Sequence, residues 1–127
     1  MESKRQKQIS ELIKRNFSLF LQDEGRLIYG STVFVTVTDV KITPDFAQAK
    51  IYLSIYNTEN KQEPILEMRE SYHRIKQEMA HRLKSQMRRI PEFDFFIDDT
   101  IDEMYRVQAL FDRLYEEDQM GSPDSEQ

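Results

Sequence analysis

Two strands joined by a tight turn are indicated by "STVFVTVTDVKITPDFAQAKIYLSIY", residues 31–56. Residues 31–42 are rich in valine and threonine, and their apolar and polar positions alternate with the period of two that strands have. Residues 49–56 alternate in the same way, with isoleucine and leucine on one side. Between them, Pro44 fixes φ and Asp45 accepts local backbone hydrogen bonds. Because this linker is so short, we expect the two strands to pair antiparallel.

Helical patterns flank the hairpin. Apolar residues recur every three or four positions in residues 3–22, which predicts an amphipathic helix. "DEGRLIYGS" then breaks the pattern, because Gly25 and Gly30 supply permissive backbone. A second helical pattern runs through residues 65–90 and ends before a proline, which cannot continue a helix.

The remaining segments complete one domain. "EFDFFID", residues 92–98, predicts a short aromatic strand, and "TIDE", residues 100–103, opens a last helix that ends near Tyr115. The periodicity therefore gives the order α–β–β–α–β–α, an α+β domain whose helices cover one face of a three-stranded sheet. We expect a domain over residues 1–116 and a disordered acidic tail over 117–127.

Composition excludes several classes of protein. A chain of 127 residues closes one core and is too small for two. It has no cysteine, so disulfides and thiolate metal sites are excluded. No apolar run is long enough to cross a membrane, and "MESKRQKQIS" lacks the apolar region of a secretory signal. We therefore expect a cytoplasmic protein.

The charge is unevenly distributed, although the formal net charge is only −5. Residues 71–90 carry six Lys or Arg against one acid, and residues 1–20 carry five against two. Residues 91–127 carry two against twelve. Such asymmetry favours a surface that faces a polyanion.

A helical wheel of residues 65–90 separates an apolar sector about 120° wide from a cationic stripe. Opposite the apolar sector lie Arg74, His81, Lys84 and Arg88, with Arg82 and Arg89 on one flank. The regular phosphates of a nucleic acid match such a stripe, and arginine contacts phosphate with two donors. The alternative is a solvated helix face, but such faces normally mix both signs of charge.

The first helix carries further candidates for RNA binding. Lys4, Arg5 and Lys7 lie at its N-terminus, the end where the helix dipole disfavours cations. That placement favours an external anionic partner over a purely structural role. Tyr52 and Tyr56 share one face of a strand, where they would either stack on bases or lie buried beneath a helix.

Patterns for catalysis and metal binding are weak. Four acids lie close together after the last strand: Asp98, Asp99, Asp102 and Glu103. Acids also gather at helix N-termini for structural reasons, and that interpretation is favoured here. His73 and His81 are too far apart for a zinc pair on one helix turn, and no serine lies in a nucleophile elbow. We expect no catalytic residue, no metal and no cofactor.

The hairpin resembles the signature region of the bacterial ribosome-binding factor A family: a T-V-T-x-V strand, a Ser/Thr-x-Asp-Leu/Phe turn, then A-x-V/I-Y-x-S. The positions that fit are Thr36, Val37, Val40, Thr43, Asp45, Phe46, Ala49, Ile51, Tyr52 and Ser54. "RQKQISELIKRNFSLFL" is similar to the first helix of the family, "RRIPEFDFFIDDTID" to its P-x-L-x-F-x-x-D-x-S segment, and "VQALF" to its I-x-x-L-L closure. The resemblance covers about residues 3–115 in the same order.

The resemblance implies a type II KH-like fold of order α-β-β-α-α-β with a short C-terminal helix. In that fold the long helical segment is two helices with a kink between them. Ser71-Tyr72-His73 stands where the family has Ala-x-Gly. The G-x-x-G loop with which KH domains clamp RNA is absent from the sequence.

The resemblance also implies a function. It predicts a non-catalytic ribosome assembly factor that binds the small (30S) subunit and promotes late maturation and 5′-end processing of 16S rRNA, often in the cold. It further implies a monomer, with an assembly GTPase as a possible partner. The alternatives are a protein-interaction module whose acidic last helix meets a basic partner, and a general KH-like RNA-binding protein.

Overall fold

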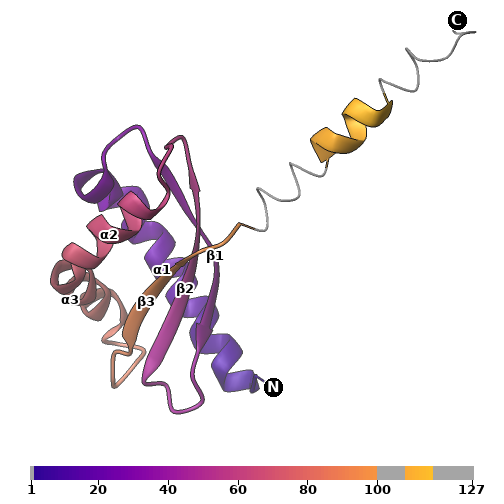
Figure 1. Ribbon diagram of the computed structural model, residues 1–127. Coiled ribbons are helices and arrows are strands. Elements are labelled where there is room, and N and C mark those ends of the chain that lie inside the picture. The colour runs from indigo at the N-terminus through magenta and orange to yellow at the C-terminus, as the bar shows by residue number, and fades with distance from the viewer. Residues whose placement is uncertain (1, 100–107, 116–127) are drawn as a thin grey trace, which may run out of the picture.

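The computed structural model describes residues 2–99 and 108–115 of the chain (Figure 1). Its elements are α1 (Lys4–Tyr29), β1 (Phe34–Ile42), β2 (Gln48–Tyr56), α2 (Gln62–Glu70), α3 (Tyr72–Leu83) and β3 (Glu92–Ile97). The predicted α+β class is confirmed. Residues 108–115 are also helical, whereas the predicted start of this helix and the acidic tail lie outside the described residues.

The three strands form one sheet in the order β1-β2-β3. β1 pairs antiparallel with β2, from Phe34 opposite Tyr56 to Ile42 opposite Ala49, which confirms the predicted hairpin. β3 pairs parallel with the other side of β2. The register shifts between Val37 and Asp39. This bulge, which simple alternation does not predict, lets Val37 and Val40 both reach the core although they are three positions apart.

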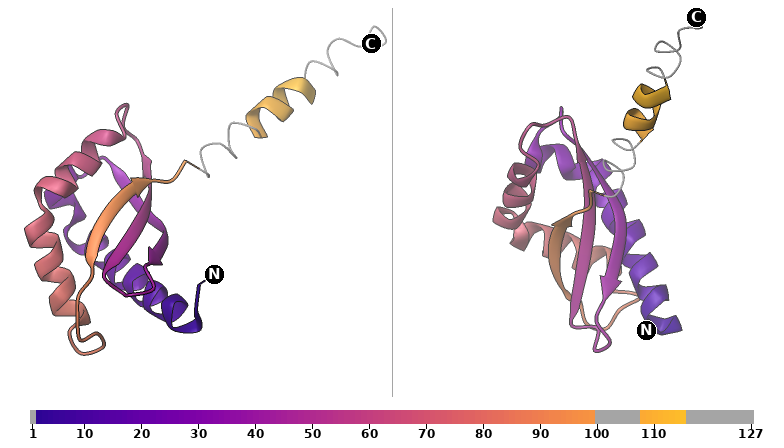
Figure 2. Two further views of the ribbon diagram at one scale, coloured as in Figure 1. Left: turned by 60° about the horizontal axis from the view of Figure 1, so that its bottom comes forward. Right: turned by 45° about the vertical axis from the view of Figure 1, so that its right-hand side comes forward.

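α1, α2 and α3 cover one face of the sheet; α1 crosses behind the strands in Figure 1, while α2 and α3 lie beside them (Figure 2). Phe17 of α1 is fully buried at the centre of this layer. Its ring centroid lies 5.8 Å from that of Phe20, 6.4 Å from that of Phe93 and 5.7 Å from that of Phe95. These four rings fasten the first helix to the last strand.

The open face of the sheet carries Tyr52 and Tyr56. Tyr52 is half-buried and stacks on Phe96 of β3, with ring centroids 5.5 Å apart, while Tyr56 is exposed. Burial of the two tyrosines beneath a helix, one of the two predicted outcomes, is therefore wrong.

α1 is one helix through Gly25, where the sequence predicts a break. The ring of Tyr29 packs where a side chain at position 25 would stand, so a Cβ at Gly25 would overlap it. The helix ends at Gly30, whose φ of 94° is the left-handed conformation that glycine tolerates. Gly30, and not Gly25, therefore ends the helix.

The continuous helix that periodicity alone predicts for residues 65–90 is wrong, because the segment is divided at Ser71 and its second helix ends early. The observed order of elements over residues 4–97 is α-β-β-α-α-β, as the resemblance implies. α2 stops at Glu70 and α3 runs only to Leu83. The backbone N–H groups of Gln86 and Met87 donate to the carbonyl of Leu83 at 2.9 Å, which turns the chain. Met87 is still buried, so the apolar spacing continues into a loop and imitates a longer helix.

Tyr72 holds the break between α2 and α3 against β3. Its hydroxyl accepts the backbone N–H of Phe93 at 2.9 Å and donates to Glu92 at 3.1 Å. Burial raises the pKa of Tyr72, whereas the bonds from Lys76 and Tyr72 lower the pKa of Glu92. The chain thus divides the two helices without the small residues of Ala-x-Gly.

Gln6 fixes the start of α1. Ser3 is the N-cap, and its hydroxyl accepts the N–H of Gln6 at 3.1 Å while the side-chain oxygen of Gln6 accepts the N–H of Ser3 at 2.9 Å. The side-chain nitrogen of buried Gln6 donates to the carbonyl of Ile42, at the end of β1, at 3.0 Å. One side chain therefore joins the helix cap to the sheet.

We expect Gln6→Ala to lower the free energy of unfolding by about 1–3 kcal/mol, because it leaves the Ile42 carbonyl without its donor and removes half of the capping box. Urea denaturation of both proteins measures the loss. Gln8→Ala, at an exposed position on the same helix turn, is the matched control. Equal stability of the two variants would contradict this role of Gln6.

Candidate nucleic-acid interface

Basic side chains gather at the end of the molecule where α1 begins. The first turns of α1, the β1–β2 turn and the loop between α3 and β3 all lie at this end (Figure 1). Arg5 of α1 lines two adjoining cavities, one of them with Lys7 and Arg15 and the other with Arg88 and Arg89. We call these five residues the basic end. Lys4, exposed in the first turn of α1, extends it.

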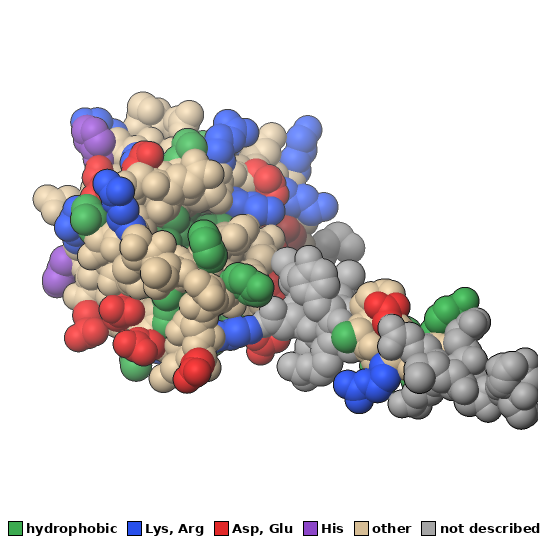
Figure 3. Space-filling view, turned by 90° about the horizontal axis from the view of Figure 1, so that it is seen from above, with side chains coloured by type: hydrophobic (Ala, Val, Ile, Leu, Met, Phe, Trp, Pro, Cys, Tyr) green, Lys and Arg blue, Asp and Glu red, His purple; other side chains and the backbone are tan. Residues whose placement is uncertain are grey.

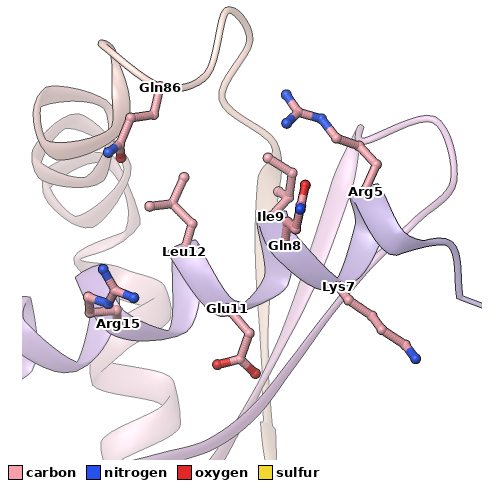
Figure 4. A pocket seen from close by; sticks show the side chains of 8 residues that line it. All are labelled: Arg5, Lys7, Gln8, Ile9, Glu11, Leu12, Arg15 and Gln86. Carbon is pink, nitrogen blue, oxygen red and sulfur yellow. The ribbon is translucent and has the colours of Figure 1, made fainter.

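The larger cavity has a volume of 510 Å³ and lies between α1 and Gln86, which follows α3. Figure 4 shows Arg5, Ile9 and Leu12 directed toward the loop that holds Gln86. Lys7 and Glu11 point to the other side of the helix. The one acid that lines this cavity is therefore turned away from the loop.

The smaller cavity, of 250 Å³, is apolar at its base and cationic around it. Buried Ile9 and Met87 and half-buried Phe46 supply the apolar surface. The arginines around it, Arg5, Arg88 and Arg89, are exposed. Phe46 reaches this place with a φ of 59°, and its backbone N–H donates to the carbonyl of Thr43 at 2.9 Å. The hairpin turn thus adds an aromatic ring to the basic end.

Asp45 is the acid of the smaller cavity. Its Oδ1 accepts the hydroxyl of Thr43 at 2.7 Å and the backbone N–H of Ala47 at 3.0 Å. The Thr43 bond, followed by the Ala47 bond, holds the pKa of Asp45 below its usual value, and Arg89 contributes in the same direction. Asp45 is therefore ionised at neutral pH, with one oxygen committed to the turn.

The continuous helical stripe predicted for residues 74–89 does not form, because Arg88 and Arg89 follow the end of α3. Arg74 instead pairs with Glu24 at 2.5 Å, and Arg82 pairs with Asp23 at 3.1 Å. Both acids belong to α1. Counting charges along one segment could not find them, because they come from a distant part of the sequence.

The other predicted residues lie apart from the basic end or at its margin. Lys84 is exposed at the C-cap of α3, and His73 and His81 are exposed on that helix. Among the residues described, Lys76 is the remaining cation of α3, and it pairs with Glu92 of β3. The structure therefore divides the predicted RNA-binding residues between a partly neutralised helix and the basic end.

The opposite end of the molecule has mixed chemistry. Figure 3 views this end, and basic, acidic and hydrophobic side chains share its surface.

Within residues 2–99 and 108–115, no three potential metal-ligating side chains come together to hold an ion, and no helix is long and apolar enough to cross a membrane. Of the four clustered acids, Asp98 accepts the hydroxyl of Thr38 at 2.6 Å, while Asp102 and Glu103 lie outside the described residues.

The low pKa of Asp45 predicts how its contribution to stability depends on pH. Because the folded pKa lies below the unfolded value of about 3.9, the contribution is complete above that value and is lost as pH falls through the folded pKa. We expect Thr43→Val to raise the pKa of Asp45 toward 3.9, since the Thr43 hydroxyl is the main cause. NMR titration of the Asp45 carboxyl measures this, and an unchanged pKa would contradict the assignment.

Comparison with known proteins identifies relatives over most of the chain. The sequence model of the family described as Ribosome-binding factor A matches residues 5–111. The ribosome-binding factor A of Christiangramia forsetii is 31% identical over 123 residues, which are 97% of this chain and 92% of that protein. The Cytophaga hutchinsonii protein is 34% identical over 114 residues, 90% of this chain and 85% of its own.

Solved structures share the fold. The crystal structure of ribosome-binding factor A from Thermus thermophilus has a TM-score of 0.59 at 18% identity and covers 72% of this chain and 94% of its own. A homology model of the Thermus thermophilus protein, fitted into a cryo-EM map of a 30S complex, has a TM-score of 0.56 at 20% identity and covers 70% and 90%. From the family match and these sequence relatives it follows that this chain belongs to the ribosome-binding factor A family.

Proposed function

We propose that this chain is a non-catalytic ribosome assembly factor that binds 16S rRNA of the small subunit through the basic end. The observation that carries the proposal is that Arg5 of α1 converges with Arg88 and Arg89 of a distant loop on one cavity. Family membership supports it, as does the relative from Thermus thermophilus, whose homology model was fitted into a 30S complex. The KH-like character of the fold belongs to the same proposal.

The electrostatics of the basic end favour an external anion. The first turn of α1 contains no acid, and its free N–H groups form the positive end of the helix dipole. Arginines beside that end repel both the dipole and one another in the unbound protein. Phosphate groups relieve this repulsion and release their own counterions, so binding weakens as salt rises.

The proposed mechanism is binding to rRNA without catalysis of a reaction. A protein that binds one rRNA conformation more tightly than others raises the population of that conformation. Bound at the small subunit, the chain would favour late maturation and 5′-end processing of 16S rRNA and block premature use of the subunit. We place this activity in the cytoplasm, with the protein as a monomer, its requirement greatest in the cold and an assembly GTPase as a further partner.

We expect the triple variant Arg5/Arg88/Arg89→Glu to lose binding to purified small subunits. Each substitution replaces a phosphate-binding group with one that repels phosphate, so the loss should exceed about tenfold, and doubling the salt concentration should weaken the wild type as well. Co-sedimentation with small subunits, large subunits and joined ribosomes measures it.

The matched control is Arg26/Lys41/Lys50→Glu, which changes the net charge equally at exposed positions that line neither cavity of the basic end. Equal loss in both variants would indicate an effect of net charge alone. Wild-type protein that sediments with none of the three particles would overturn the proposed function.

A second candidate function is a protein-interaction module. The helix of residues 108–115 exposes four large apolar side chains: Leu110, Phe111, Leu114 and Tyr115. This described part of the predicted acidic helix is apolar, with Asp112 beside Arg113. Such a stripe favours a protein partner over RNA.

Nuclease treatment separates the two functions. If the basic end binds rRNA, ribosomal material captured by the tagged chain should be lost after digestion of RNA. Capture that survives digestion but disappears in Phe111→Ala/Leu114→Ala would instead assign binding to the apolar helix.

A further inference from the structure

We propose that the smaller cavity of the basic end binds a single unpaired nucleotide, with its base against Ile9, Phe46 and Met87 and its phosphate on the surrounding arginines. This inference rests on the proposed function, because it names the part of the rRNA that the basic end would contact. The cavity is built by three separate segments, α1, the hairpin turn and the loop after α3.

The chemistry of the base of the cavity fits a nucleobase. Ile9 is 5% exposed and Met87 is 9% exposed, so both are set in the core and present a fixed apolar surface. Phe46 adds an aromatic ring from the turn, held in place by the bond from its N–H to Thr43. Bases that have left a helix stack on aromatic and apolar side chains in this way.

The size of the cavity bears on the ligand. Its 250 Å³ lies just below the range of about 300–1,000 Å³ typical of sites for drug-sized ligands, a size that suits one base. In an RNA duplex the bases are paired and stacked inside the helix, so no base has a free face to pack on such a surface. The occupant is therefore an unpaired nucleotide from a loop, a bulge or an end.

The preference of the cavity for an anion beside the base comes from Arg5, Arg88 and Arg89. All three are exposed, and no ion pair within 4.0 Å involves any of them among the residues described. This distinguishes them from Arg74 and Arg82, which are paired with acids of α1. Guanidinium groups from two elements can approach one phosphate from different sides.

Asp45 supplies selectivity between bases. Its Oδ1 is held by Thr43 and Ala47, so the carboxylate is fixed at the cavity wall, and it repels phosphate from that side. A carboxylate accepts hydrogen bonds from the amino and imino groups of a base. Oδ2 is left to accept from the amino or imino N–H of guanine, whereas the single N–H of uracil lies between two carbonyl oxygens that a carboxylate repels. The cavity should therefore prefer guanine to uracil.

The open face of the sheet is a weaker candidate for the same ligand. Tyr52 and Phe96 already stack on each other there. Asp39 and Asp94 are exposed on that face beside Lys41 and Lys50, so the charge is mixed. A phosphate would meet both signs of charge, whereas at the smaller cavity it meets three arginines and a single acid.

Methyl NMR of the full chain tests the inference, with guanosine monophosphate, uridine monophosphate and inorganic phosphate titrated separately at equal ionic strength. We expect guanosine monophosphate to shift the methyl signals of Ile9 and Met87, with an affinity at least about fivefold above that of uridine monophosphate. Asp45→Asn keeps an acceptor for the turn but loses the charge, so it should reduce this preference. Arg88→Gln/Arg89→Gln should weaken both nucleotides, and Lys41→Gln/Lys50→Gln neither.

Two outcomes would overturn the inference. Equal methyl shifts with inorganic phosphate would show an anion site that does not read a base, and unshifted Ile9 and Met87 signals would show that the cavity takes no nucleotide. If small subunits still bind the wild type and not the basic-end variant, either result leaves the proposed function intact.

Discussion

The structure depends on the burial of Phe17 between the first helix and the last strand. Its ring lies within 6.4 Å, centroid to centroid, of Phe20, Phe93 and Phe95. Because α1 and β3 are fastened together at this point, the N-terminal turn of α1 comes to lie beside the loop that precedes β3. Arg5 and Arg89, which are far apart in the sequence, thereby reach one cavity. The same aromatic contacts that build the core therefore place the candidate site.

Ion pairs between α1 and α3 neutralise one part of the surface, while another part stays positively charged. Acids in the second half of α1, Asp23 and Glu24, neutralise Arg82 and Arg74 of α3. At the start of the same helix, the ion pairs within the described part of the chain involve neither Arg5 nor the arginines of the loop. A chain of net charge −5 thus presents a positive end, although Arg74 and Arg82 of α3 are paired with acids.

The sequence predicts those elements of the fold that depend on local periodicity. The hairpin, the third strand and the start of α1 near Ser3 follow from the alternation of the strands and the periodicity of the helix. It does not predict the end of α3, because buried Met87 keeps a helical spacing while its backbone turns. It also does not predict that α1 continues through Gly25, where the ring of Tyr29 takes the space of a side chain. The sequence identifies Arg5, Arg88 and Arg89 as candidates by their charge. Only the tertiary fold brings them to the same cavity as Phe46.

The parallel pairing of β2 with β3 bears on when the cavity forms as the protein folds. A hairpin closes through neighbouring residues, whereas Gln48 meets Glu92 only after the intervening helices have packed. The loop that carries Arg88 and Arg89 is fixed in place by that last pairing. We therefore expect the cavity to be completed late as the chain folds. A nascent or partly unfolded chain would expose its arginines without the cavity on which the proposed selectivity depends.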